Sequence, residues 1–398
     1  MWDIALEVTR YDRQIKAATS VLTEETVASI PVELMSAVGV KLGFWLQSAA
    51  KKHIRSIAIF SLCKRFLLEV PAKEPVSGTR NSEAPYELVM ETLLRNWFDG
   101  EPKIGSTIEE PYRGVFSQVA DGKALGLKYA RRALLQQIGS FFAVDAEWTK
   151  ANLVPLLSWS DKKDVARESW ENAVLSNRYE PKLLEVIWPD FEIAIDKYAG
   201  FGEMGRKGLV DLLVCHALRS VKAKAKKLCT KALENLPDKG LEKASLNIYE
   251  RLTFKGNNHD VVWRNEVAPF LMTIWPGDKK YRNADVFCHL ADGILSLDES
   301  FAEAVDCLKG FARSDKCHMT FGHVLESGIK GGSSHCTRHP HAALKLLSYI
   351  GDFSDFPISS LRNCLDQIRA ATNNASDVIS SAEFKRLSDL VAEKSNDW

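Results

Sequence analysis

Apolar residues recur at three- and four-residue steps along the whole chain, which is the spacing of one face of an α-helix. The first such stripe consists of Ile4, Ala5, Val8, Tyr11 and Ile15. The period-two alternation of apolar and polar residues that β-strands need is nearly absent. The pattern therefore predicts an all-α chain.

Short turns separate the segments that carry this spacing. The predicted helices are one around 4–15, a segment from Pro31 to Leu46, and then 52–70, 86–99, 112–120, 122–144, 146–158, 161–176, 181–198, 208–220, 221–236, 240–254, 257–275, 281–296, 298–313, 319–329, 340–350, 357–372 and 379–394. Polar stretches at Pro71 to Pro85 and at Lys330 to His339 predict longer loops.

An internal echo favours stacked helix pairs over a single globule. The tripeptide Ile-Trp-Pro occurs at 187–189 and again at 274–276, and we interpret both copies as turns. Their separation is about two helical-hairpin repeats of the HEAT or armadillo length class. We therefore expect an α-solenoid, with helical-repeat halves at 1–205 and 206–398 or one continuous array. Two helical bundles that meet near 200–210 are the alternative.

Trp148, Trp159 and Trp170 are spaced by elevens, which is about three helical turns. A ligand role is conceivable for such a series. Buried aromatic residues dominate core energetics, however, so we expect these three to pack between helices.

Net charge and hydropathy narrow the choice of cellular compartment and of partner class. The chain has 52 basic and 52 acidic residues, so no net field steers it toward nucleic acid or an anionic membrane. No apolar run is long enough to cross a bilayer, and no secretory signal is visible at the N-terminus. The eight cysteines form no disulfide framework, which suits a reducing compartment. We expect a soluble cytoplasmic protein that does not bind membranes.

The glycines at 200, 202 and 205 match a dinucleotide fingerprint as a string. That fingerprint requires a preceding strand and an acidic residue about twenty positions later. A predicted helix precedes the glycines here, and Ala225 stands among lysines. We expect the glycines to end one helix and open the next, and we expect no cofactor.

Five of the nine histidines lie between 317 and 341. A structural zinc site could be written with Cys317, His323, Cys336 and His339, although only the last two have ordinary ligand spacing. The favoured interpretation is a histidine-rich helix–loop–helix without metal, because the spacing is irregular and no second cysteine pair exists.

A basic stretch runs from 219 to 231. Its members are Arg219, Lys222, Lys224, Lys226, Lys227 and Lys231. Apolar residues between them form an inward stripe, so the favoured interpretation is a solvated outer face. The alternative is a contact with nucleic-acid phosphates through Arg219, Lys222, Lys226 and Lys227. No zinc finger or helix-turn-helix supports that alternative, so nucleic acid is not the expected partner.

Catalytic motifs are absent from the sequence. Neither a Gly-x-Ser-x-Gly elbow nor a His-Glu-x-x-His metal motif occurs. Acidic pairs such as Glu109-Glu110 lie at predicted helix starts, where carboxylates cap amides. We therefore expect no enzyme and no catalytic residue in this chain.

Several local strings together resemble one bacterial family. They are Trp2-Asp3-x-Ala5-Leu6-Glu7, Arg10-Tyr11-Asp12-Arg13-Gln14, Val144-Asp145-x-Glu147-Trp148-Thr149, Pro155-Leu156-Leu157-x-Trp159, Trp263-Arg264-Asn265-x-Val267-x-Pro269-Phe270-Leu271, Ile274-Trp275-Pro276, Leu325-Glu326-Ser327-Gly328-Ile329 and Cys364-Leu365-Asp366-x-Ile368-Arg369. This set is similar to the helical C-terminal region of bacterial anti-phage defence proteins that often carry an N-terminal sirtuin-like, NAD-consuming domain.

The resemblance implies a role in recognition and assembly, not in NAD hydrolysis. The effector domain of such proteins is not in this sequence, so we expect either a fragment of a longer protein or an effector on a separate polypeptide. The leading hypothesis is a non-catalytic sensor or scaffold that binds a phage component or an effector module. The alternatives are a nucleic-acid module that uses 219–231 and a zinc protein or enzyme centred on 317–341.

Overall fold

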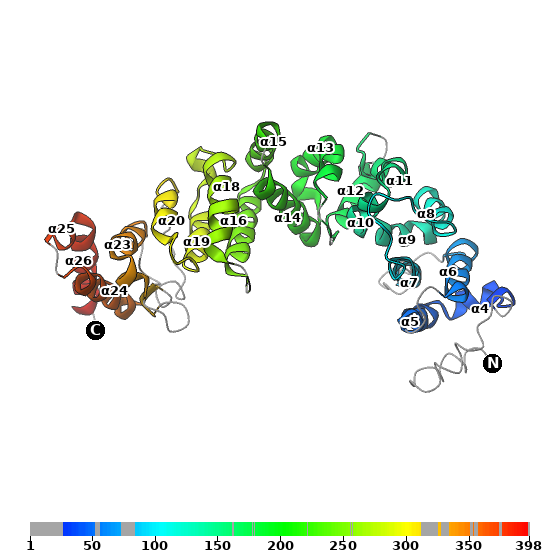
Figure 1. Cartoon of the computed structure of the whole chain (residues 1–398), viewed down its shortest axis with the longest axis horizontal. Helices are drawn as coiled ribbons and strands as arrows, with labels where there is room; N and C mark the ends of the chain where they lie inside the picture. Colours follow the sequence, from blue (N-terminus) through cyan, green and yellow to red (C-terminus); the bar gives the residue numbers. More distant parts are fainter. Residues whose placement is uncertain are drawn as a thin grey trace. The chain divides into compact units, whose positions relative to one another are not determined.

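The computed structural model is helical throughout the part of the chain that it describes (Figure 1). The described residues are 27–51, 56–72, 84–160, 163–176, 178, 180–220, 222–254, 256, 258–311, 325–327, 334–350, 353, 357–373 and 376–396. Within these ranges the regular elements are helices and no β-strand forms. The predicted all-α class is confirmed. The predicted helix at 4–15 lies outside the described residues.

The chain divides into two compact units, Met1–Gly208 and Leu209–Trp398. The boundary falls within helix α14 (Glu203–Arg219). Among the described helices α14 is the longest, at 17 residues, which corresponds to about 26 Å at 1.5 Å per residue. No helix in the described ranges combines the length and the apolar character that a bilayer crossing requires.

In the first unit the helices follow the predicted stripes. Their bounds are α4 Val32–Ala37, α5 Gly39–Ala50, α6 Ile57–Glu69, α7 Ala84–Phe98, α8 Tyr112–Asp121, α9 Leu125–Gln136, α10 Ile138–Val144, α11 Ala146–Asn152, the 3-10 turn η2 Val154–Leu157, α12 Lys163–Ala173, α13 Pro181–Asp196 and the 3-10 turn η3 Tyr198–Gly200. Side-chain caps fix the starts of α6 and α11, among others. Ser56 accepts a hydrogen bond from the N–H of Ile59, and Asp145 accepts one from Trp148.

The first unit's core is a chain of helix contacts. Helix α5 packs against α7, α7 against α9, and α9 against α12. An aromatic cluster fills the space beside them. The ring of Trp97 stacks on that of Phe141 at 5.0 Å between centroids, and Phe116 meets Phe141 edge-on at 5.2 Å. Such pairs contribute beyond the area that they bury.

The three tryptophans spaced by elevens are buried, as predicted. Each indole N–H also has an acceptor. Trp148 donates to the hydroxyl of Ser117 at 2.9 Å, and Trp159 and Trp170 donate to backbone carbonyls at 3.0 and 2.9 Å. Buried indoles need such a partner, because an unsatisfied N–H costs free energy.

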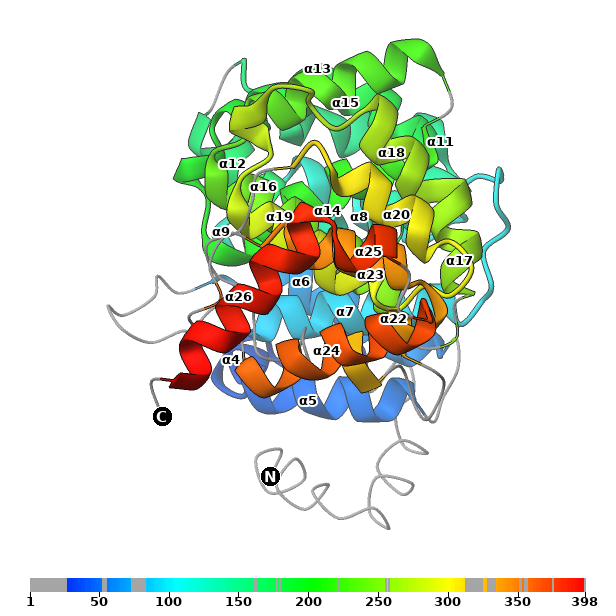
Figure 2. The ribbon, with the colours of Figure 1, turned by 90° about the vertical axis from the view of Figure 1, so that its left-hand side faces the viewer.

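The second unit continues with short helices. Their bounds are α15 Ala223–Glu234, α16 Asp238–Thr253, α17 His259–Val262, the π-helical turn η4 Trp263–Val267, α18 Ala268–Thr273, the 3-10 turn η5 Lys279–Tyr281, α19 Ala284–Ile294, α20 Phe301–Leu308, α22 His335–Arg338, α23 Pro340–Ser348, α24 Ile358–Ala371, α25 Ser376–Ile379 and α26 Ala382–Asn396. Helix α16 packs against α19, α20 against α23, and α24 against α26. Figure 2 shows α24 and α26 side by side.

One group of side-chain hydrogen bonds joins helices at separations of 36 to 45 positions in sequence, beside others at 12 to 16 and at 31 to 32 positions. Pairs of the first group, with their separations, are Gln47–Glu91 (44), Arg132–Glu87 (45), Arg132–Glu168 (36), Asn247–Asp211 (36), Ser245–His289 (44), His335–Leu295 (40) and Arg386–Ser348 (38). The pairs occur in both units. In each of them a residue meets the part of the chain that lies roughly forty positions away, which is the length of one helical hairpin.

The two Ile-Trp-Pro copies differ in structure, so the interpretation of both as turns is wrong for the first. Helix α13 runs through Pro189, whereas the second copy follows the end of α18 and leads into Gly277. A proline inside a helix removes one backbone N–H donor. The side chain of the next residue, Asp190, contacts the segment that precedes α12. It accepts a hydrogen bond from the N–H of Trp159 at 3.0 Å.

A predicted helix is broken and a predicted loop is partly helical. The predicted helix 122–144 splits at Gln137, and α10 begins beside the segment that contains Arg178. A Cβ on Gly139 would lie 2.2 Å from the carbonyl oxygen of Arg178, so only glycine permits this approach. In the predicted loop 330–339, the helix α22 forms with His335 buried in its first turn.

Candidate functional site

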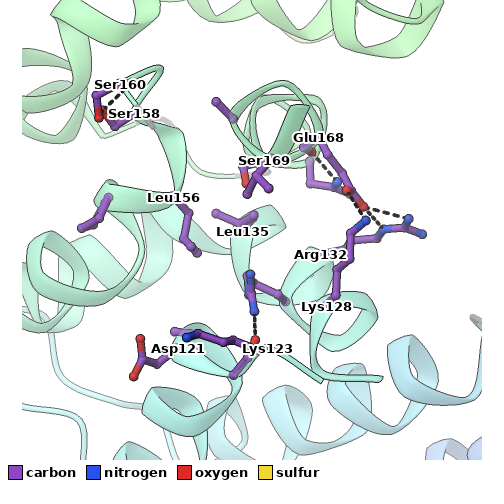
Figure 3. A pocket seen from close by; sticks show the side chains of 17 residues that line it. Asp121, Lys123, Lys128, Arg132, Leu135, Leu156, Ser158, Ser160, Glu168 and Ser169 are labelled. Atoms are coloured by element: carbon purple, nitrogen blue, oxygen red, sulfur yellow. Dashed lines mark hydrogen bonds and ion pairs between the residues drawn. The ribbon is translucent and has the colours of Figure 1, made fainter. Parts of the chain in front are cut away.

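A cleft of about 500 Å³ opens on the first unit between α9 and α12. Its remaining wall comes from the C-terminal end of α8 and from η2 with the residues that follow it. The volume is within the range of ligand pockets, about 300–1,000 Å³. Figure 3 shows Leu135 and Leu156 in the middle of the view, with charged side chains toward its lower and right-hand edges. The cleft thus has an apolar centre and a charged rim.

Helical spacing places the side chains around the cleft. On α9, residues 128, 131, 132 and 135 share one face, and on α12 residues 165, 166, 169 and 172 do so. The two faces are opposed because α9 packs against α12. Ala166 and Leu135 are nearly inaccessible to solvent and form the floor. The sequence therefore builds the cleft from two ordinary amphipathic helices.

An ion-pair network closes one side of the cleft. The carboxylate of Glu168 accepts hydrogen bonds from Lys128 Nζ at 2.9 Å and from Arg132 Nη2 at 2.9 Å (Figure 3). Arg132 Nη1 also contacts Glu87 at 3.1 Å. Burial alone would raise the pKa of Glu168, but the hydrogen bonds from Lys128 and Arg132 outweigh it and lower this pKa. Glu168 is therefore held as a carboxylate.

The side chain of Arg131 extends from α9 to the C-terminal end of α8. Its Nε donates to the carbonyl of Val119 at 3.3 Å, and its Nη2 donates to the carbonyl of Gly122. These acceptors are at the C-terminal end of α8, where carbonyls lack helical partners and a cation is favoured. Burial lowers the pKa of Arg131, and the carboxylates of Glu168 and Asp121 offset part of this effect. A guanidinium stays protonated regardless.

Serine hydroxyls complete the polar part. Ser158 and Ser160 lie 3.1 Å apart, oxygen to oxygen, and Ser169 is buried on the α12 side. The described residues that line the cleft include neither histidine nor cysteine. A serine nucleophile needs an adjacent base to become reactive. The arrangement is suited to binding through hydrogen bonds and charge.

The histidine-rich segment is partly described. Cys317 and His323 lie outside the described residues. Cys336 is fully buried, and its thiol is hydrogen-bonded to that of Cys364. His339 lies near a different group, with its ring centroid 5.7 Å from that of Phe301. Among the described residues no three potential ligands are grouped to hold a metal ion. The zinc alternative stays a prediction.

In this segment the side chain of His335 packs against other parts of the second unit. Its ring stacks on Phe301 at 4.1 Å between centroids, and its Nε2 is 2.9 Å from the carbonyl oxygen of Leu295. Burial lowers the pKa of His335, although the hydrogen bond to Leu295 opposes this shift. The same cause, burial, lowers the pKa of His339. Both rings therefore favour the neutral form.

The side chains of the basic stretch 219–231 do not all lie on one exposed face. Lys222 and Lys227 are exposed at the start and in the middle of α15, and Arg219 ends α14. Lys226 instead turns toward α18, where its Nζ donates to the hydroxyl of Thr273 at 3.3 Å. The four candidate residues thus do not share one free face.

The glycines of the dinucleotide-like string end and begin helices, as predicted. Gly200 closes η3, and α14 begins at Glu203. The N–H of Gly202 donates to the carboxylate of Glu171 at 2.9 Å. This N–H is therefore already satisfied by a side chain of the same unit.

The cleft was not predicted from the sequence. Its signal was nevertheless present in the predicted helix 122–144, where three cations at 128, 131 and 132 share one helical face. What the sequence does not contain is the identity of the opposing face, which lies 36 residues later on α12.

No protein-family model matches the chain, and a search of curated proteins finds no match.

Proposed function

We propose that this chain is a non-catalytic helical-repeat sensor or scaffold that recognises another protein. The proposed architecture is an α-solenoid of stacked helical hairpins, like HEAT and armadillo arrays. In such arrays each hairpin buries its apolar face only against its neighbours, and the long outer surface is left for partners.

The observation that carries this proposal is the recurring separation of the side-chain contacts between helices. Many of these contacts join residues 36 to 45 positions apart in both units, for example Arg132 with Glu168 and Ser245 with His289, while others, such as Trp148 with Ser117, span 31. Stacked hairpins of about forty residues make a separation of this size recur, beside the shorter separations between helices of one hairpin. The recurrence supports a repeat array in each unit.

The cleft between α9 and α12 supports the recognition role. It combines an apolar centre with a polar rim, which is the composition of a site that holds part of another molecule. Its hydroxyls have no neighbouring imidazole or thiol among the described lining residues. Binding accounts for these groups without a chemical step.

The proposed biological setting is bacterial anti-phage defence. Only the resemblance of the local strings to helical regions of such proteins supports it. The partner would then be a phage component or an effector module, and the cytoplasm would be the place of action.

Binding to purified partners tests the proposal. The whole chain is immobilised and titrated with individual phage structural proteins and with effector proteins encoded beside its gene. We expect saturable binding to one of them that survives physiological salt. A chain that binds none of these proteins, and whose expression leaves the plating efficiency of a phage panel unchanged, would count against the sensor role.

A nucleic-acid module is the second candidate. The observation in its favour is the run of exposed lysines on α15, namely Lys224, Lys227 and Lys231. Phosphate contacts weaken steeply with salt, so wild-type binding to a DNA duplex should fall as salt rises. Lys227→Glu should reduce this binding, and Lys239→Glu on α16 serves as the matched control. Absence of retention on DNA at low salt would remove this candidate.

A further inference from the structure

We propose that the cleft between α9 and α12 binds an acidic peptide segment of a protein partner. In this arrangement Lys123 and Arg131 hold a carboxylate, and Leu156, with Pro155 beside it, holds a neighbouring apolar side chain. The inference rests on the proposed recognition role and names the chemistry of the partner.

The charges around the cleft leave an excess of cations. Lys128 and Arg132 are balanced by Glu168 and Glu87 within the ion-pair network. Two cations, Lys123 and Arg131, then face one carboxylate, Asp121. Lys123 is exposed and makes no ion pair with any described residue. An anionic group that enters the cleft therefore meets a site that attracts it.

Arg131 is prepared to bind an anion. Two carbonyls fix its guanidinium through Nε and Nη2, so little conformational entropy is lost when a ligand arrives. Nη1 makes no hydrogen bond with the described residues, and Arg131 lines the cleft. One charge-assisted donor is thus free at a fixed place. A side-chain carboxylate is the acceptor that matches it in a protein partner.

The apolar centre favours a peptide over a small free anion. Leu156 is half-buried between Pro155 and Leu157, and Leu135 lies opposite it (Figure 3). A free phosphate would leave the exposed part of Leu156 without a partner. A peptide with an aliphatic or aromatic residue beside an acidic one covers both parts of the cleft and gains free energy from each.

Selection from a peptide library tests this specificity. The whole chain is used to select from yeast-displayed random peptides of about twelve residues, and the dissociation constants of selected peptides are measured by fluorescence polarisation. We expect enrichment of Asp or Glu next to Leu, Ile, Met or Phe. Lys123→Glu should weaken binding about tenfold, because it replaces attraction by repulsion.

Matched variants separate a local effect from a general one. Lys103→Glu makes the same charge change at an exposed position of the first unit outside the cleft, and we expect it to leave affinity within about twofold. Leu156→Asp should weaken the same peptides at least as much as Lys123→Glu. Unchanged circular dichroism and melting temperature show that each variant folds.

Three outcomes would overturn the inference. They are failure of any peptide to be enriched, equal affinity of selected peptides for wild type and Lys123→Glu, and displacement of the peptide by inorganic phosphate at a matching concentration. A protein partner that binds wild type and Lys123→Glu equally would reject the cleft as the docking site and leave the scaffold role standing.

Discussion

Two nitrogens of Arg132 on α9 donate to one carboxylate oxygen of Glu168 on α12, with Nε–Oε1 at 3.1 Å and Nη2–Oε1 at 2.9 Å. The two residues are 36 positions apart and come from helices that pack against each other. Both side chains are about three-quarters buried. The contact thus joins two hairpin-sized segments and forms one side of the cleft.

Breaking this contact should lower stability. We expect Glu168→Ala to reduce the free energy of unfolding by about 1–2 kcal/mol, because a hydrogen-bonded, partly buried charge pair is lost. Urea denaturation of the single variants and of Glu168→Ala/Arg132→Ala gives the coupling energy. The control is Asp164→Ala, which removes an exposed pair with Arg167 and should cost less than about 0.5 kcal/mol. Equal costs at the two sites would refute the proposed importance of the α9–α12 contact.

The sequence contained the local part of this arrangement. Helix α12 was predicted at 161–176, and its apolar stripe with Trp170 was expected to be buried. The pairing of Arg132 with Glu168 was not predictable, because many cations and carboxylates occupy compatible helix faces. Only the three-dimensional stacking selects one pair.

The break at Gln137 and the unexpected helical turn at His335 have similar physical causes. At Gln137 no proline interrupts the pattern, and Gly139, just after the break, meets the segment at Arg178, which is distant in sequence. At His335 a glycine- and serine-rich stretch predicted a loop. Burial against Phe301 and the acceptor at Leu295 stabilise a helical turn there. Tertiary contacts decide both places.

Trp170 should be among the most sensitive positions of the first unit. It is fully buried, and its indole donates to the carbonyl of Leu157. We expect Trp170→Ala to cost about 3–5 kcal/mol through the cavity, and Trp170→Phe to cost about 1–3 kcal/mol through the unpaired carbonyl and lost volume. Chemical denaturation measures both. Phe44→Ala, at a ring that is 58% exposed, should change stability by less than about 0.5 kcal/mol. A smaller loss at Trp170 than at Phe44 would contradict this packing.

The cysteines should differ in reactivity in the native protein. Burial raises the pKa of Cys229 to about 12, and it also raises the pKa of Cys63. Each pKa unit lowers the thiolate fraction about tenfold, and the thiolate is the reactive form. We expect both to resist a thiol-specific disulfide reagent until urea unfolds the chain, while the less buried Cys307 reacts earlier. Mass spectrometry of timed samples identifies the labelled sites. Labelling of Cys63 before Cys307 would be the contrary result.

The buried ring of His335 should make the second unit less stable in acid. Burial lowers the pKa of His335 below the value of 6.5 that an unperturbed histidine has, so the folded state binds the proton more weakly than the unfolded state. The stabilisation is complete above about pH 6.5 and is lost as the pH falls toward the folded-state pKa. Protonation also has a structural cost, because Nδ1 is buried without a partner among the described residues.

Substitution isolates this contribution. His335→Phe retains an aromatic ring against Phe301 but cannot be protonated, so we expect urea denaturation at about pH 7 and pH 5 to show a smaller loss of stability than wild type. Its stability at pH 7 should itself be lower by about 1 kcal/mol, because the carbonyl of Leu295 loses its partner. His341→Phe is the control at an exposed histidine of the same segment, and its pH dependence should match wild type. An unchanged pH dependence in His335→Phe would assign the acid sensitivity to other groups, with the ring of His339, whose pKa burial also lowers, as the next to replace.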